Sequence, residues 1–192
     1  MDKVLLIAGP SAVGKTTVMD DILARDKRFS PSRSATTRQP RGDGRDSEYV
    51  YLTREEFISR IESGDILEYT EYAGNLYGTP RAEIERILDE GKYPVLVLDL
   101  CGIESFKRRS AEYKSVACYI TAPLDVLDAR LRDRAAMDAN NEKAILTMKK
   151  RQDQNRRDLD HFSSVAHLFD LVVENIRVED TSNAILDFFI NA

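Results

Sequence analysis

Four short runs of apolar residues along the chain predict the strands of one buried sheet. They cover residues 3–8, 94–100, 115–121 and 171–173. Continuous apolar runs of this length are typical of parallel strands that have helices on both faces. Between these runs, and after the last one, apolar residues recur at helical spacing, so strands alternate with helices. The pattern predicts an α/β fold with a parallel sheet flanked by helices.

Residues 34–80 interrupt this alternation, and we interpret them as an insertion into the sheet. Two stretches within them, 49–52 and 66–72, are rich in aromatic and alternating apolar residues and predict two strands. Thr53 and Glu56 have the spacing of a capping box, which predicts the start of a helix between those strands.

Three further helices follow along the chain. The first is predicted to begin with Thr79 as its N-cap and Pro80 at its first helical position. The second covers 124–134 and carries leucines on one face, and the third, 142–162, is strongly charged. The link between them, 135–141, is polar and has no periodicity. For most of the charged residues of the third helix, a solvated surface is the simplest interpretation.

The bulk composition is that of an ordinary globular protein. The chain has 192 residues, of which 42% are hydrophobic and 32% charged, enough for one domain with a sizeable core. No apolar run approaches the roughly 18 residues that a membrane span needs. The net charge of −5 argues against a broad nucleic-acid-binding surface. Two cysteines beside apolar runs predict buried thiols in a reducing cytoplasm, and the two histidines lack metal-ligand spacing.

One motif makes a specific chemical prediction, because it fits the phosphate-binding loop (P-loop) pattern. It lies between the first apolar run and the first predicted helix and reads Gly9-Pro10-Ser11-Ala12-Val13-Gly14-Lys15-Thr16. Gly9 and Gly14 permit backbone angles that turn successive amides toward one anion, and the following helix start adds further donors. Lys15 supplies a full positive charge, and the Thr16 hydroxyl can ligate the magnesium that accompanies nucleotide phosphates. The alternative, a glycine turn that precedes a helix by chance, is a rare coincidence.

An acidic chain that binds phosphate must concentrate positive charge locally, and the stretch after the first helix does so. Arg33, Arg38, Arg41 and Arg45 lie among hydroxyl residues, prolines and glycines that prevent a continuous helix. The planar fork of Arg can grip a phosphate bidentately, whereas Lys cannot. A solvated basic loop is the alternative, but the exclusive use of Arg favours a phosphate site.

These residues resemble the guanylate kinase family over nearly the whole chain. Beside the P-loop, the resemblance is carried by Ser34-Ala35-Thr36-Thr37-Arg38-Gln39-Pro40-Arg41, Leu67-Glu68, Gly74-Asn75-Leu76-Tyr77-Gly78-Thr79, and Asp99 at the end of a core strand. The P-loop alone indicates only the use of a nucleotide or phosphate, but the other segments at these distances are highly specific. The resemblance implies an enzyme that moves the γ-phosphoryl group of ATP, its co-substrate, to GMP (and dGMP) with Mg²⁺, giving ADP and GDP.

The resemblance also implies a role for individual residues. The GMP phosphate would be held by Ser34, Arg38, Arg41, Tyr49 and Tyr77, and the guanine base by Glu68, Thr79 and Asp99. ATP would be bound by Gly9, Pro10, Ser11, Ala12, Val13, Gly14, Lys15, Thr16, Thr17 and Asn175, with Thr16 beside the Mg²⁺. The transferring phosphoryl group would be stabilised by Lys15, Arg38, Arg130, Arg134 and Arg151.

The implied architecture is a P-loop nucleoside-monophosphate kinase core with an inserted monophosphate-binding subdomain and a mobile lid, all in one domain. The core would comprise 1–33, 81–123 and 163–192, the insertion 34–80 and the lid 124–162. We further expect a cytoplasmic monomer or weak homo-oligomer whose partners are the small molecules GMP and ATP, with no nucleic acid and no membrane.

The chain also departs from the family pattern. Val97 occupies a place where Asp is common, and Cys101 one where Gln is common. The loop before Tyr49 is one residue shorter than usual, and residues 163–168 look like a small insertion. None of these departures removes a residue that we assign to phosphate chemistry.

Two other functions stay open at this point. A related P-loop kinase of a phosphorylated sugar would share the ATP side, but it has no need of Glu68 and Thr79 at a base pocket. A non-catalytic guanylate-kinase-like binding module would typically lack an intact P-loop, whereas this chain keeps Gly14, Lys15 and Thr16.

Overall fold

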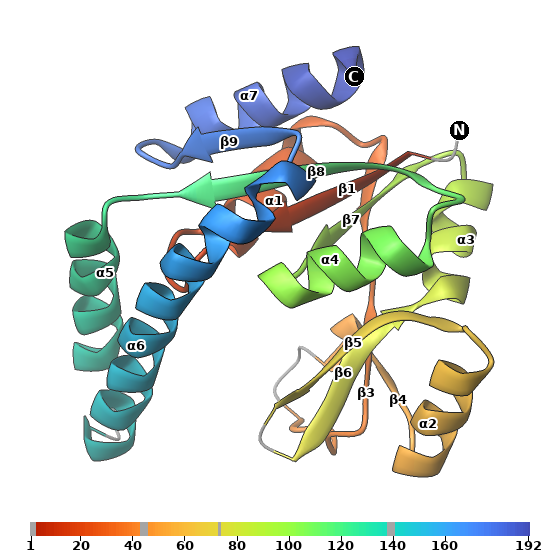
Figure 1. Ribbon diagram of the computed structural model, residues 1–192, viewed down its shortest axis with the longest axis horizontal. Coiled ribbons are helices and arrows are strands. Elements are labelled where there is room, and N and C mark those ends of the chain that lie inside the picture. The colour runs from red at the N-terminus through yellow and green to blue at the C-terminus, as the bar shows by residue number, and fades with distance from the viewer. Residues whose placement is uncertain (1–2, 43–45, 73, 138–140) are drawn as a thin grey trace.

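Two β-sheets organise the part of the chain that the structure describes (Figure 1). This computed structural model describes residues 3–42, 46–72, 74–137 and 141–192. Arg45 of the predicted arginine cluster and part of the predicted polar link lie outside these ranges.

The larger sheet has five parallel strands in the order β2-β7-β1-β8-β9. They are β1 (Lys3–Ala8), β2 (Phe29–Pro31), β7 (Tyr93–Val97), β8 (Lys114–Thr121) and β9 (Leu171–Glu174). In the central strand, Leu5 lies opposite Val95 on one side and Val116 on the other. The predicted parallel sheet is confirmed, and β2 is a short edge strand that the apolar pattern did not predict.

Helices cover both faces of this sheet (Figure 1). They are α1 (Lys15–Arg25) and α7 (Val178–Asn191) on one face, and α3 (Arg81–Asp89) and α4 (Leu100–Arg109) on the other. Leu5 and Ile7 belong to the core cluster of α1 and α7, whereas Leu6 belongs to that of α3 and α4. Successive side chains of a strand point to opposite faces, so one apolar run fills both cores. In the ranges described, no helix is long and apolar enough to cross a membrane.

The smaller sheet has four strands in the order β4-β3-β6-β5. They are β3 (Ser34–Thr36), β4 (Tyr49–Tyr51), β5 (Ile66–Tyr72) and β6 (Asn75–Pro80). Helix α2 (Arg54–Glu62) starts with the predicted capping box of Thr53 and Glu56, and its Phe57 is buried against this sheet. The strands predicted over 49–52 and 66–72 are confirmed, but β3 and β6 were not predicted.

Two helices, α5 (Leu124–Ala136) and α6 (Asn141–Val165), lie side by side and project from the larger sheet, on the side away from the small sheet (Figure 1). The C-terminal end of α6 returns to the core, where the ring of Phe162 stacks on Tyr119 with centroids 4.0 Å apart. A short 3₁₀ turn, η2 (Ala166–Leu168), follows. Residues 163–168 therefore form the end of α6 and this turn.

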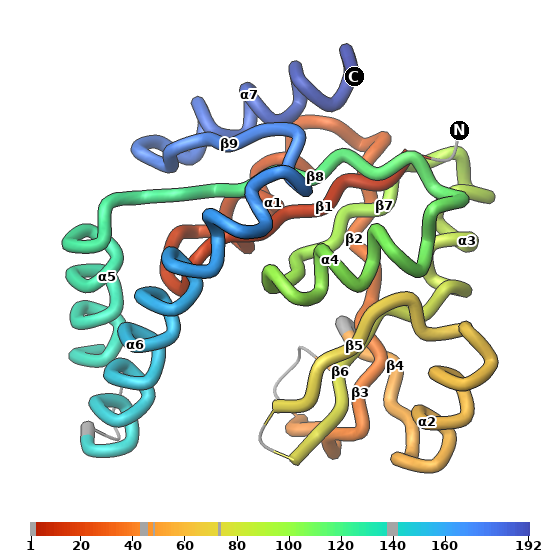
Figure 2. The backbone as a smooth tube through the Cα atoms, in the orientation of Figure 1, coloured from red at the N-terminus to blue at the C-terminus, as the bar shows by residue number. Residues whose placement is uncertain are grey.

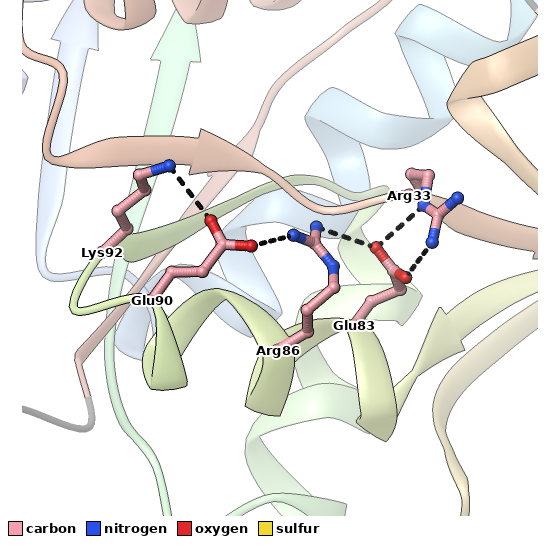
Figure 3. Close-up of polar contacts among 5 residues, drawn as sticks. All are labelled: Arg33, Glu83, Arg86, Glu90 and Lys92. Carbon is pink, nitrogen blue, oxygen red and sulfur yellow. Dashed lines mark hydrogen bonds and ion pairs between the residues drawn. The ribbon is translucent and has the colours of Figure 1, made fainter.

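The chain crosses between the two sheets at two neighbouring places, from β2 to β3 and from β6 to α3. An ion-pair network links these two crossings. Figure 2 shows the chain running from β2 into β3, and α3 follows directly after β6 on the way back. Arg33, between β2 and β3, donates to the buried carboxylate of Glu83 in α3, with Nε 3.0 Å from Oε2. Arg86, Glu90 and Lys92 extend the network along α3 (Figure 3).

Two predicted boundaries that bear on the candidate site were wrong. The strand predicted over 94–100 ends at Val97, and Asp99 instead caps α4 by accepting the Gly102 N–H at 2.6 Å. Thr79 is not an N-cap, because it lies in β6 and α3 begins at Arg81. Its hydroxyl is used elsewhere, in a hydrogen bond to the buried carboxylate of Glu68.

Candidate active site

The P-loop connects the C-terminal end of β1 to the start of α1, as the motif predicts. Gly9 (φ 153°) and Gly14 (φ 102°) both adopt backbone angles that favour glycine. A Cβ at Gly9 would collide with the carbonyl oxygen of Ile120, so the loop packs closely against β8. Ala12 (φ 66°) also has a left-handed backbone, which a residue with a side chain adopts only at a cost.

Lys15 lies against the loop that it belongs to. Its ammonium group donates to the carbonyl oxygens of Gly9 at 2.7 Å and Pro10 at 3.0 Å. Burial lowers the pKa of Lys15 to about 8, while the negative charges of Asp158 and Asp99 act in the opposite direction. A partly desolvated cation is strongly attracted to an incoming phosphate, because little water has to be displaced.

A cleft opens in front of the loop and brings together residues from distant parts of the chain. Its walls include Lys15, Thr16 and Thr17 from the loop and α1, Arg130 and Arg134 from α5, and Arg151 from α6. Tyr72 of the small sheet also lines it. The structure therefore brings nine residues predicted for ATP binding or catalysis to one cleft: Ser11, Ala12, Gly14, Lys15, Thr16, Thr17, Arg130, Arg134 and Arg151.

Arg130 differs from the other cleft arginines because it already contacts the loop. Its guanidinium donates to the carbonyl oxygens of Val13 at 3.3 Å and Ala12 at 3.5 Å, and to that of Asn175 at 3.3 Å. Arg134 is exposed, and Arg151 is half-buried. The three arginines therefore differ in how far they are held by protein contacts.

Asn175, predicted to bind ATP, has its side chain turned toward the P-loop. Its amide donates to the carbonyl oxygen of Val13 at 2.7 Å, and its oxygen accepts the Thr181 hydroxyl at 3.1 Å. A Cβ at Gly14 would come within 2.7 Å of the same amide nitrogen. In this structure the side chain supports the loop, and an ATP contact stays a prediction.

A second polar site joins the small sheet to the core. Glu68 in β5 is only 6% exposed, and its Oε1 accepts the hydroxyl of Thr79 in β6 at 2.6 Å. Burial, together with the charge of Asp99 at the start of α4, raises the pKa of Glu68 to about 7, although the hydrogen bond from Thr79 acts in the opposite direction. The three residues predicted to face the guanine therefore lie together.

The residues predicted to hold the GMP phosphate lie mainly along β3, β4 and β6. Ser34 is opposite Tyr49 in the β3–β4 register, and the rings of Tyr49 and Tyr77 approach edge to face at 6.5 Å. The guanidinium of Arg38 lies 5.2 Å from the centre of the Tyr49 ring. Arg41 is exposed, and its backbone N–H donates to Asp46. Four of the five residues therefore cluster, and Arg41 lies at the edge of the group.

The sequence reasoning missed two residues of α6 near the loop. Asp158 is close enough to Lys15 to influence its pKa. Asn155 is fully buried and contacts the backbone of Ser11. In the sequence, a polar residue at a core-facing position of a charged helix is only weak evidence for a functional role. The tertiary contact is what reveals that role.

The chain is similar to known guanylate kinases in sequence and in structure. A family model described as Guanylate kinase matches residues 1–192. The chain is 36% identical over 175 residues to the guanylate kinase of Porphyromonas gingivalis, a match that covers 89% of this chain and 87% of that protein. It is 34% identical over 196 residues to the guanylate kinase of Mesoplasma florum, covering 98% of this chain but 60% of that longer protein. The solved structure of a guanylate kinase from Anaplasma phagocytophilum superposes with a TM-score of 0.67 at 27% identity, covering 98% of this chain and 84% of that one.

Proposed function

Because the chain belongs to the guanylate kinase family, we propose that it transfers the γ-phosphoryl group of ATP to GMP, giving ADP and GDP. The observation that carries this proposal is the buried carboxylate of Glu68 beside the Thr79 hydroxyl, on the small sheet that faces a P-loop cleft. Guanine presents N1–H and an exocyclic amine side by side, and a carboxylate can accept both. Adenine presents no such pair of donors.

Phosphoryl transfer needs little covalent help from protein, so positioning and charge neutralisation do the catalysis. Lys15 and the backbone amides of residues 9–17 hold the β- and γ-phosphates of ATP. Arg38 and Arg41, with the phenols of Tyr49 and Tyr77 and the hydroxyl of Ser34, hold the dianionic phosphate of GMP. Arg130, Arg134 and Arg151 neutralise the charge that spreads over the transferring group.

Magnesium fits this cleft as an ion that arrives with the nucleotide. The Thr16 side chain is exposed on the cleft wall, where its hydroxyl can supply one oxygen ligand. Within the described ranges, no group of three or more His, Cys, Asp and Glu side chains is arranged to hold a metal ion by itself. Mg²⁺ commonly keeps several waters and binds substrate phosphates with only one or two protein ligands. When bound, it neutralises charge on the β- and γ-phosphates.

The proposal divides the chain as the resemblance implies. Residues 1–33, 81–123 and 163–192 form the core, residues 34–80 form the insertion that binds GMP, and residues 124–162 form a lid over ATP. The two sheets and the projecting pair α5 and α6 support this division. Cys118 is buried as predicted, but Cys101 is exposed, and both thiols are free. Free thiols support a reducing cytoplasmic location, and we propose a monomer or weak homo-oligomer.

A coupled assay of ADP release tests the function. The purified protein is offered Mg·ATP with GMP, dGMP, AMP, UMP, CMP or ribose bisphosphate. We expect turnover with GMP and rejection of AMP by a factor of roughly 10⁴, because AMP leaves the buried carboxylate unpaired. Preference for ribose bisphosphate would favour a sugar-phosphate kinase, and binding of GMP without turnover would favour a non-catalytic module.

A further inference from the structure

Asn155 of α6 forms a two-point contact with the P-loop, across 144 positions of sequence. Its Oδ1 accepts the Ser11 N–H at 2.7 Å, and its Nδ2 donates to the Ser11 carbonyl oxygen at 3.1 Å. Asn155 is 0% exposed, whereas Ser11 is half-buried. An amide side chain is one of the few groups that can satisfy a backbone donor and a backbone acceptor at once.

This contact determines the direction of an amide in the predicted phosphate cradle. In a trans peptide the C=O and the following N–H point in opposite directions. Holding the Ser11 carbonyl on Asn155 therefore also orients the N–H of Ala12. Arg130 and Asn175 hold the carbonyls of Ala12 and Val13 in the same way. Three consecutive carbonyls of the loop are thus bound by side chains from outside it.

The loop needs such support because part of its backbone is strained. Ala12, next to Ser11, has a φ of 66°, an angle that a residue with a Cβ rarely adopts unless its surroundings impose it. Without the bonds to Asn155, the peptides around Ser11 can rotate toward a relaxed geometry. The cradle amides would then no longer point together at an anion.

We propose that Asn155 is a positioning residue that holds the P-loop in its phosphate-binding conformation and fixes α6 against it. The proposal rests on the proposed function only for the identity of the anion, ATP. The same helix carries Arg151, one turn before Asn155, into the cleft. One contact therefore sets both the shape of the loop and the position of a lid arginine relative to it.

The test compares ATP binding in Asn155→Leu, which keeps the number and branching of the side-chain heavy atoms but removes both bonds, with binding in the parent protein. Calorimetric titration with Mg·ATP in the absence of GMP should give a dissociation constant about tenfold higher or more, because two backbone groups of the loop lose the partner that orients them. In addition, amide exchange at Ser11 should accelerate. Asn155→Ala, which also removes both bonds and adds no charge near the phosphates, should give the same two results and carries the test if Asn155→Leu does not fold.

A matched control separates positioning from general stability. Val165→Ala removes buried packing from the end of the same helix, at a position that belongs to the core cluster rather than to the cleft. It should lower stability and leave both ATP affinity and Ser11 exchange unchanged. If a folded Asn155→Leu protein bound ATP within twofold of the parent, or if Val165→Ala weakened ATP binding equally, Asn155 would be only a structural residue. Because no readout requires GMP, failure of the proposed function would appear separately, in the substrate panel.

Discussion

The hydroxyl of Thr79 and the carboxylate of Glu68 form a 2.6 Å hydrogen bond between neighbouring strands, with both side chains buried. The bond uses one lone pair of Oε1 and leaves the other acceptor positions of the carboxylate for a ligand. The Thr79 hydroxyl thereby orients the group that we assign to guanine. Loss of the carboxylate should accordingly affect GMP and leave the P-loop side intact.

In Glu68→Gln, one acceptor oxygen becomes a donor amide that opposes the N–H groups of guanine. We expect kcat/KM for GMP to fall by a factor of about 10² or more, with Mg·ATP affinity nearly unchanged. Steady-state kinetics with GMP and calorimetry with Mg·ATP measure the two effects. Glu71→Gln, at an exposed position of the same strand, is the control and should behave as the parent. Full GMP activity in Glu68→Gln would disprove the assignment.

The buried Glu68 should also make stability depend on pH. Its pKa is raised to about 7 from an ordinary 4.5, so between these values the folded protein retains a proton that the unfolded chain has released. Stability from this group is full below pH 4.5 and is lost as the pH rises through 7. As the pH rises from 4.5 to 8, the parent should therefore lose up to about 3 kcal/mol of its free energy of unfolding relative to Glu68→Gln. Urea denaturation at several pH values measures the difference in free energy of unfolding between the two proteins. A difference that does not change with pH would contradict the prediction.

Lys15→Ala should remove catalysis while leaving the fold intact. The ammonium group contacts the Gly9 and Pro10 carbonyls and lines the cleft, but it packs little of the core. We expect kcat to fall by about 10² or more, because preorganised charge at the transferring phosphoryl group is lost. Lys27→Ala, at an exposed site just after α1, should retain the parent's rate. A Lys15→Ala protein with parental kcat would mean that the loop does not bind the reacting phosphates.

Ala12→Gly should stabilise the protein, although most substitutions by glycine do the opposite. At a φ of 66° a Cβ is unfavourable, so we expect the free energy of unfolding to rise by about 0.5–1 kcal/mol. Ala82→Gly, at an exposed position inside α3, should lower it by about 1 kcal/mol. Denaturation midpoints of the two variants measure the contrast. Equal losses in both would show that Ala12 is not strained.

The network between the sheets predicts a further stability difference. Arg33 and then Arg86 lower the pKa of the buried Glu83 carboxylate, so this group stabilises the fold at neutral pH and less as the pH falls. Glu83→Gln should cost about 1–2 kcal/mol at pH 7, because charge-assisted bonds are replaced by neutral ones. Glu90→Gln removes two exposed ion pairs, with Arg86 and Lys92, and should cost clearly less than Glu83→Gln. Similar costs for the two variants, measured by urea denaturation, would contradict the role of Glu83.

Local signals made much of the site predictable from sequence. The P-loop is continuous in the chain, and its glycines and Lys15 follow an apolar strand, so its place in the fold could be predicted without tertiary information. Glu68 and Thr79 came from the family resemblance, and the structure brings them together. The prediction that Thr79 caps a helix was wrong, because a hydroxyl close to a helix start can equally well donate to a buried acceptor on a neighbouring strand.

What could not be predicted depends on contacts between distant parts of the chain. β2 and β3 have three residues each, too few for a periodic pattern, and exist because they pair with β7, β4 and β6. In the sequence, Asn155 is one polar residue among many in a polar helix. Only the fold brings it to Ser11. The side-chain direction of Asn175 was likewise set by Val13 and Thr181, which are 162 and 6 positions away.

The contact between Asn155 and Ser11 also divides α6 into a segment before it, which can move, and a segment after it, which is held by the core. The helix spans 25 residues, and Phe162 and Val165 near its end pack into the core, so the contact would act as a pivot for the part of the helix before it. The arm from Asn155 back to the first turn of α6, which lies beside α5, is about 21 Å long at 1.5 Å per residue. A rotation of roughly 15° about that pivot would carry the tip of the arm about 5 Å. Arg151, one turn from the pivot, would move much less than the tip, so closure of the proposed lid would keep this arginine within reach of the phosphates.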